Sequence, residues 1–244
     1  MDAESRLLLR LVPGKRTAEN CDKVVEDATI STGSRTDLLI TTDEFALHTS
    51  AIEKAYSVQA PQTKSSGPGR PPAPKRVMPE GLCHATVRKT WQKGRVVQVV
   101  RSIVFGTTAL LSTLLSRSRA SLTINTSFVE RHNGTDRGQN SRKARKSYCF
   151  SKEWDLHNDA SFFIGLSYNF CWPVRTLRLK DADGRWQSRT PATAAALADH
   201  VWTTEERACE GHDGDRGSRR NRRDKGHDFR TLGRSSVARS LTSG

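Results

Sequence analysis

Strand patterns and helix patterns alternate at the start of the chain, in SRLLLRLV (residues 5–12), TAENCDKVVEDA (residues 17–28), DLLIT (residues 37–41) and FALHTSAIEKAY (residues 45–56). The first stretch is a continuous apolar run closed by Pro13-Gly14, which is typical of a buried strand. Thr17 is a residue type that caps a following helix. The order strand, helix, strand, helix predicts an α/β fold with a crossover connection.

The composition changes over residues 58–82, which contain the run GPGRPPAPKR (residues 67–76). Such a Pro/Gly/Arg-rich stretch predicts an extended linker. We therefore expect one core built in two parts, residues 1–57 and residues 83–206, on either side of this linker. Residues 207–244 are polar and rich in Gly, Arg, Asp and Ser, which predicts a disordered basic tail because such a segment cannot build a core.

The second part of the core contains further strand and helix patterns. Two β-like runs, residues 84–89 and 95–105, flank Gln92-Lys93-Gly94 and predict a hairpin. Helices are predicted for residues 107–116, around Glu130 with an interruption at Gly134, for residues 152–170 after a Ser151 cap, and for residues 190–201. Helical spacing places five large side chains of the third helix in the core, namely Trp154, Phe162, Phe163, Leu166 and Phe170.

Charge indicates the class of partner. The chain has 40 Lys and Arg against 26 Asp and Glu, a formal net charge of +14. This excess favours nucleic acid or another polyanion and predicts salt-sensitive binding. The five cysteines include no CxxC pair, so neither a zinc ribbon nor a disulfide framework is indicated. The apolar stretches are too short to span a bilayer, and we expect a soluble, cytoplasmic protein with no membrane partner.

Three acidic residues occupy positions that suit a metal site in an α/β protein. Asp2 precedes the first predicted strand, Asp43 follows the second, and Glu130 lies on a predicted helix. Two carboxylates at strand ends and a third on a neighbouring helix can hold two metal ions about 3.5–4 Å apart. Each has an ordinary alternative: a frayed terminus for Asp2, a helix N-cap for Asp43, and an ion pair with Arg131 or Arg137 for Glu130.

Arginines and other polar residues surround Glu130 in the sequence. Arg131, Asn133 and Arg137 follow it closely, and Asn133 and Arg137 share its predicted helix face. A basic run comes next, made of Arg142, Lys143, Arg145 and Lys146. A carboxylate facing phosphates would weaken plain DNA binding, so we expect these cations to hold DNA while Glu130 binds a divalent cation. The histidines form no metal-spaced pair, and His132 is expected to face the DNA.

Several short segments, taken in their order, resemble DDE transposases of bacterial insertion sequences, in particular the insertion-sequence-one-like group. The segments are Asp2-Ala3-Glu4-Ser5-Arg6-Leu7, Val12-Pro13-Gly14-Lys15-Arg16-Thr17, Thr42-Asp43-Glu44, Phe128-Val129-Glu130-Arg131-His132-Asn133, Lys143-Ala144-Arg145-Lys146, Phe150-Ser151-Lys152-Glu153-Trp154 and the run from Tyr168 to Leu177. The resemblance covers about residues 2–206, and the order of the segments is its specific part.

The resemblance implies an RNase H-like core with a two-metal site for Mg²⁺ or Mn²⁺. It implies Asp2, Asp43 and Glu130 as the catalytic, metal-binding carboxylates. The implied reaction is hydrolysis of a phosphodiester at a transposon end, followed by attack of the freed 3′-OH on target DNA. The implied partners are the transposon ends, the target DNA and other copies of the chain in a homo-oligomer.

The chain also departs from the family pattern. Only Met1 precedes Asp2, although the first aspartate of an RNase H-like core lies on its first strand. We therefore expect an incomplete core that lacks most of this strand, in a copy that is truncated at its N-terminus, and both an active and an inactive copy remain open. The tail from residue 207 has the composition of a shifted reading frame.

Two alternatives to a transposase remain open. A non-catalytic basic nucleic-acid-binding protein would bind DNA without any need for metal and would tolerate Glu130→Ala. A translated pseudogene product without a stable fold would melt without cooperativity.

Overall fold

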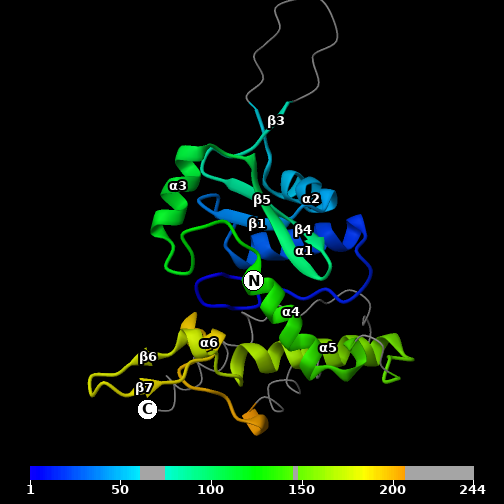
Figure 1. Ribbon diagram of the computed structural model, residues 1–244, viewed down its shortest axis with the longest axis vertical. Coiled ribbons are helices and arrows are strands. Elements are labelled where there is room, and N and C mark those ends of the chain that lie inside the picture. Colours follow the sequence, from blue (N-terminus) through cyan, green and yellow to red (C-terminus); the bar gives the residue numbers. More distant parts are fainter. Residues whose placement is uncertain (61–74, 145–147, 207–244) are drawn as a thin grey trace, which may run out of the picture. The chain divides into compact units, whose positions relative to one another are not determined.

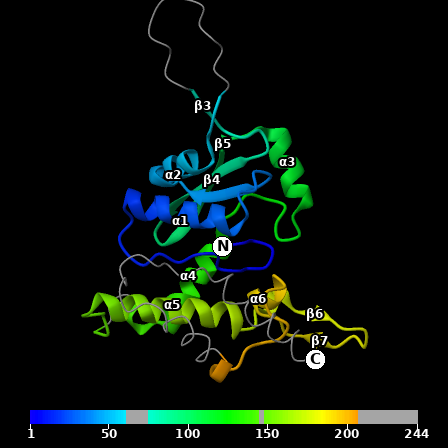
Figure 2. The same ribbon diagram turned by 180° about the vertical axis from the view of Figure 1, so that it is seen from behind.

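The computed structural model describes residues 1–60, 75–144 and 148–206. In these residues the fold is mixed α/β, as the sequence predicts, and the chain divides into two compact units (Figures 1 and 2). The sheet unit is Lys15–Thr126, and the helical unit is Met1–Gly14 together with the chain from Ser127 onward. Residues 61–74 of the predicted linker and the predicted tail of residues 207–244 lie outside the described residues.

A three-stranded sheet forms the centre of the sheet unit, in the order β1-β4-β5. β1 (Leu39–Asp43) runs parallel to β4 (Cys83–Gln92), and β4 runs antiparallel to β5 (Arg95–Phe105). The second predicted strand and the predicted hairpin are thereby confirmed. Lys93 and Gly94 form the turn with φ of 48° and 77°, a left-handed pair that a two-residue hairpin turn requires.

Helices cover both faces of this sheet (Figures 1 and 2). Ile52 and Tyr56 of α2 (Ala46–Tyr56) pack with Val25 of α1 (Ala18–Ser31) on one face, whereas Leu111 of α3 (Thr108–Arg117) packs with Cys83, Ala85 and Val87 on the other. Each helix was predicted from its pattern, and the Thr17 hydroxyl caps α1 by accepting from the Asn20 N–H at 3.3 Å. A short pair, β2 (Val58–Gln59) and β3 (Arg76–Val77), joins the two ends of the predicted linker.

The helical unit has a core of its own around α5 (Trp154–Phe170). The other elements are α4 (Ser127–Gln139), η1 (Ser141–Lys143), η2 (Arg175–Leu177), β6 (Leu179–Lys180), β7 (Trp186–Gln187) and α6 (Pro191–Ala194). Phe170 is fully buried and stacks on Trp202 with ring centroids 4.2 Å apart. The Trp202 N–H also donates to the Phe170 carbonyl at 3.0 Å, so the chain after α6 is fixed to the end of α5.

The first predicted strand is wrong. Residues 5–12 are not paired in any sheet of the described chain, although Leu7, Leu8 and Leu9 are buried as the apolar run predicts. The partner is a side chain instead. Asn169 accepts from the Leu8 N–H at 2.9 Å and donates to the Leu8 carbonyl at 3.0 Å, which satisfies the backbone without a neighbouring strand.

Three helix predictions for this unit need correction. α4 continues through Gly134 without interruption. α5 begins at Trp154 with Glu153 at the N-cap, and the Ser151 hydroxyl contacts His157 Nδ1 at 2.9 Å rather than capping the helix. α6 ends after a single turn at Ala194 instead of continuing to residue 201.

The prediction that five large side chains of α5 lie in the core is only partly confirmed. Phe170 is fully buried and Leu166 is 8% exposed, but Trp154 and Phe163 are 57% and 50% exposed. The helix is apolar over more of its circumference than the core covers. Periodicity therefore identified the helix but not the width of its buried stripe.

Candidate functional site

The Asp2 carboxylate is held inside its own turn. Its Oδ2 accepts from the Ser5 N–H at 3.0 Å and is also bound by the Ser5 hydroxyl, and its Oδ1 accepts from the Glu4 N–H at 3.4 Å. The Asp2 N–H donates to the Leu7 carbonyl at 2.8 Å. Asp2 is therefore ordered by local hydrogen bonds, and the alternative of a frayed terminus does not describe it.

Glu130 lies in the first turn of α4 and is exposed. The same helical unit links the Asp2 turn to this helix, because the Arg6 guanidinium lies over the Phe128 ring, 3.3 Å from its centroid. Burial lowers the pKa of Arg6, and Arg131 acts in the same direction, while Asp2 opposes the shift. Arg6 thus lies within electrostatic reach of both Asp2 and the start of α4.

Asp43 belongs to the sheet unit, where it is the last residue of β1. Its Oδ2 accepts from the Arg16 guanidinium at 2.6 Å, and its Oδ1 lies 3.5 Å from His48 Nε2. Arg16 in turn lies over the Phe45 ring, 4.2 Å from its centroid. Phe45 is the N-cap residue of α2, so Asp43 is not the cap that the alternative interpretation requires.

The three predicted carboxylates have separate environments. Asp2 and Glu130 belong to the helical unit and Asp43 to the sheet unit. Among residues 1–60, 75–144 and 148–206, no group of three or more His, Cys, Asp or Glu side chains is placed to hold a metal ion. Asp2 accepts from backbone N–H groups and Asp43 pairs with a protein cation, so each would have to exchange these partners to bind a metal ion.

The predicted DNA-binding residues of α4 are exposed. Arg131, Asn133 and Arg137 all have exposed side chains, on the same helix as Glu130. Arg142 is half-buried in η1. Asn133 and Arg137 lie on the same side of α4 as Glu130, whereas Arg131 points about a quarter turn away from it. A helix of the helical unit thus offers a carboxylate and two guanidinium groups to solvent.

Lys143 has a structural partner. Its ammonium donates to both carboxylate oxygens of Asp136, at 3.1 and 2.9 Å, and the two side chains are only 18% and 16% exposed. This pair joins η1 to α4, because Asp136 lies one turn before the helix ends. Lys143 therefore stabilises the fold through this ion pair and is not exposed for binding a ligand. Arg145 and Lys146, the other two cations of the predicted basic run, lie outside the described residues.

His132 does not face a ligand, contrary to the expectation from sequence. Its side chain is buried at 6% exposure and its ring meets Tyr168 edge-on, with centroids 4.4 Å apart. Burial lowers the pKa of His132 to about 4, and the nearby N-terminal amino group and Lys143 act in the same direction. His132 is thus a neutral core residue at physiological pH, placed by the helical spacing that turns its neighbours Arg131 and Asn133 outward.

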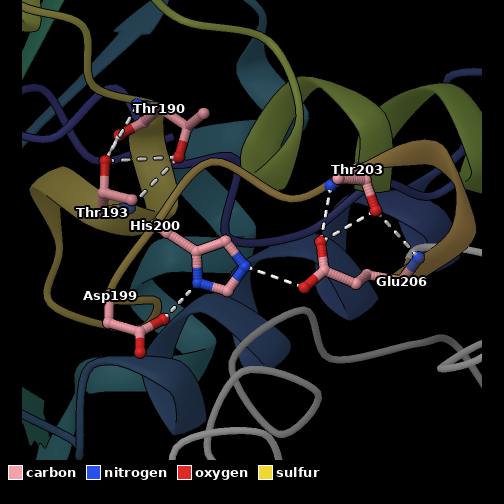
Figure 3. A network of polar contacts seen from close by, with 6 residues as sticks. All are labelled: Thr190, Thr193, Asp199, His200, Thr203 and Glu206. Atoms are coloured by element: carbon pink, nitrogen blue, oxygen red, sulfur yellow. Dashed lines mark hydrogen bonds and ion pairs between the residues drawn. The ribbon is translucent and has the colours of Figure 1, made fainter.

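A polar network at residues 199–206 was not recognised from sequence (Figure 3). His200 lies between two carboxylates, with Nδ1 2.6 Å from Asp199 and Nε2 2.8 Å from Glu206. Glu206 also accepts from the Thr203 N–H at 2.7 Å, and the Glu206 N–H donates back to the Thr203 hydroxyl at 3.3 Å. Threonine followed three residues later by glutamate is the sequence signature of a capping box, so the Thr203–Glu206 contact could have been predicted from the sequence.

This network predicts a local pH response. Hydrogen bonds to Glu206 and then Asp199 raise the pKa of His200, and hydrogen bonds to Thr203 and His200 lower the pKa of Glu206 to about 2. The contribution of His200 to stability is complete below pH 6.5 and is lost as the pH rises through its raised folded pKa, whereas that of Glu206 is complete above pH 4.5 and is lost as the pH falls through about 2. We expect the His200 ring resonances to titrate above pH 6.5 by NMR, and to move back toward 6.5 in Glu206→Gln. Unchanged titration in that variant would contradict the network, and His157, outside it, serves as the internal control.

Comparison with known proteins adds no family assignment: no protein-family model, curated protein or solved structure matches this chain. In the described residues, no helix combines the length and apolar character needed to cross a lipid bilayer.

Proposed function

We propose that this protein is a DNA transposase of the DDE type, similar to the insertion-sequence-one-like group. Its proposed reaction is hydrolysis of a phosphodiester at an element end, followed by attack of the freed 3′-OH on a phosphodiester of target DNA, which joins the element end to the target strand and releases the target's own 3′-OH. The observation that carries the proposal is the exposed surface of α4, where Glu130 shares one side of the helix with Asn133 and Arg137 and Arg131 lies next to it in the sequence.

Charge supports DNA as the substrate. The whole chain has a formal net charge of +14, and the side chains of Arg131 and Arg137 are exposed on one helix. Arginine forms short, charge-assisted hydrogen bonds with phosphate oxygens, often two at a time. The α4 surface is therefore suited to hold a DNA backbone next to a carboxylate.

The fold is compatible with an RNase H-like core, which is part of the proposal. Such a core needs a mixed sheet with helices packed on it, and the sheet unit contains parallel and antiparallel pairs with helices on both faces. Asp43 ends β1, the strand position at which a catalytic carboxylate of an α/β protein is usually found.

The cleavage part of the proposal rests on the resemblance. Mg²⁺ or Mn²⁺ is the implied cofactor, and such ions stabilise the attacking and leaving oxygens of an in-line displacement. In this structure the Asp2 carboxylate accepts from backbone N–H groups and the Asp43 carboxylate pairs with Arg16. In this proposal Arg131 and Arg137 bind and orient the DNA strand, while Arg6 ties the Asp2 turn to α4 through the Phe128 ring.

The test is nicking of supercoiled plasmid by the purified chain in buffer containing Mn²⁺. We expect wild type to relax the plasmid and Glu130→Ala to do so at least about 100-fold more slowly, because a lost transition-state interaction of several kcal/mol has this effect. Glu53→Ala, at an exposed acid on α2, should leave the rate unchanged. Circular dichroism checks that the three proteins fold alike. Equal nicking by wild type and Glu130→Ala would contradict a catalytic Glu130.

A non-catalytic DNA-binding protein is the second candidate, and the Asp43 environment favours it. Asp43 already has the Arg16 guanidinium as a partner at 2.6 Å, and no three-ligand group exists in the described part of the chain. This candidate predicts salt-sensitive DNA binding that is the same with Mn²⁺ and with a chelator. It also predicts that wild type fails to nick the plasmid.

A further inference from the structure

The β-hairpin of the sheet unit extends past the rest of its sheet (Figure 1). β1 pairs with β4 only as far as Val87, which lies opposite Asp43. β4 and β5 remain paired from there to the turn. Residues 88–100, called the ribbon below, therefore form a two-stranded structure to which no other strand of the described chain is added. All of its side chains are exposed except the half-buried Lys89.

The ribbon is cationic throughout. Residues 83–105 contain no Asp or Glu, and the ribbon carries Arg88, Lys89, Lys93 and Arg95. Because side chains alternate between the two faces of a strand, Arg88 and Lys89 lie on opposite faces, and Lys93 lies at the turn. Arg88 meets Glu44 at 3.4 Å, but both side chains are more than half exposed, and such a pair exchanges partners at little cost.

Apolar side chains are exposed beside these cations. Trp91 is 62% exposed and Val97 is 56% exposed, and three further valines of the ribbon are about two-fifths exposed, namely Val96, Val99 and Val100. A two-stranded ribbon is marginally stable in water by itself, and proteins usually protect long apolar edges from solvent and from other chains. The ribbon thus has the composition of a surface that a partner covers.

Charge decides which partner fits. Pairing with the ribbon of a second copy would bring two acid-free cationic strands together, which is unfavourable. Duplex DNA offers phosphates along both walls of each groove and apolar base edges and sugars between them. A two-stranded ribbon also fits the major groove, which is about 12 Å wide.

We propose that the ribbon is a second DNA-binding element, which enters the major groove of duplex DNA. Arg88 and Lys89, on its opposite faces, and Lys93 and Arg95, near its end, contact phosphates, while Trp91 contacts the groove surface. This inference rests on the proposed function for the identity of the polyanion. It differs from that function in the surface it uses, because the ribbon belongs to the sheet unit and α4 to the helical unit.

The test measures binding of the full-length chain to a fluorescent 20-base-pair duplex by anisotropy, over a series of salt concentrations. Lys93→Gln with Arg95→Gln is the ribbon variant, and both positions are exposed, so the fold should be retained. Loss of two phosphate contacts should weaken binding roughly tenfold and reduce the slope of log K against log salt by about 2. The matched control, Arg117→Gln with Arg185→Gln, removes the same charge from exposed positions elsewhere and should change affinity less than about twofold.

A third variant, Arg131→Gln with Arg137→Gln, separates this inference from the proposed function. If this variant loses affinity and the ribbon variant matches the control, the ribbon inference is overturned and the α4 proposal stands. If the ribbon variant loses affinity and the α4 variant does not, the ribbon inference stands and the α4 proposal is overturned. Ribbon-dependent binding to vesicles of phosphatidylserine and phosphatidylcholine, with DNA binding unaffected, would also overturn the inference.

Discussion

Replacing Asn169 with leucine is expected to lower the free energy of unfolding by about 2–6 kcal/mol, because each buried polar group left without a partner costs about 1–3 kcal/mol. Asn169 is fully buried, and its amide both donates to the Leu8 carbonyl and accepts from the Leu8 N–H. Leucine has a similar volume but can make neither bond, so two backbone groups of the buried Leu8 would be left unpaired.

Urea unfolding of the full-length chain, followed by circular dichroism, measures this loss. The control is Asn20→Ala, which removes the hydrogen bond from Asn20 to the Lys15 carbonyl at an exposed site and should cost under about 1 kcal/mol. Equal effects of the two substitutions would mean that the segment around Leu8 does not depend on the Asn169 amide.

For the segment around Leu8, the sequence predicts burial correctly but does not identify the hydrogen-bond partner. A run of apolar residues correctly predicted burial of Leu7, Leu8 and Leu9. The same run predicted a strand, because a strand is the usual way to satisfy a buried backbone. The actual partner is a side chain 161 positions away in the sequence, and no local pattern identifies such a contact.

Elements with a local signal were predicted best. The Thr17 cap, the Lys93-Gly94 turn and the apolar strand ending at Asp43 each depend on residues within a few positions of one another. Phe163 was placed in the core wrongly, because helical spacing identifies an apolar side of a helix but not how much of it a neighbour covers.

The candidate site was predictable in part for the same reason. The exposure of Arg131 and Arg137 and the burial of His132 follow from the period of one helix, once the buried face is known. The Arg16 partner of Asp43 and the Asp136 partner of Lys143 could not be identified among 40 cations and 26 acids. The largely buried Lys143–Asp136 pair removes a cation from ligand binding, whereas the exposed Arg16–Asp43 pair can exchange partners.

The largest expected effect concerns strand transfer, the step that separates a transposase from a simple nuclease. The measurement is covalent joining of labelled DNA duplexes with free 3′-OH ends to a supercoiled plasmid in Mn²⁺. The terminal base pairs of these duplexes are randomised, so that the pool includes ends that the protein can recognise. Product is scored as label that migrates with plasmid DNA under denaturing conditions.

The account predicts labelled plasmid with wild type and with Glu53→Ala. It predicts a loss of at least about 100-fold with Glu130→Gln or Asp43→Asn, since each removes a carboxylate on which transition-state stabilisation depends. Salt-sensitive binding of the same duplexes by all four proteins, with no joined product from any of them, would contradict the transposase proposal and leave a DNA-binding protein.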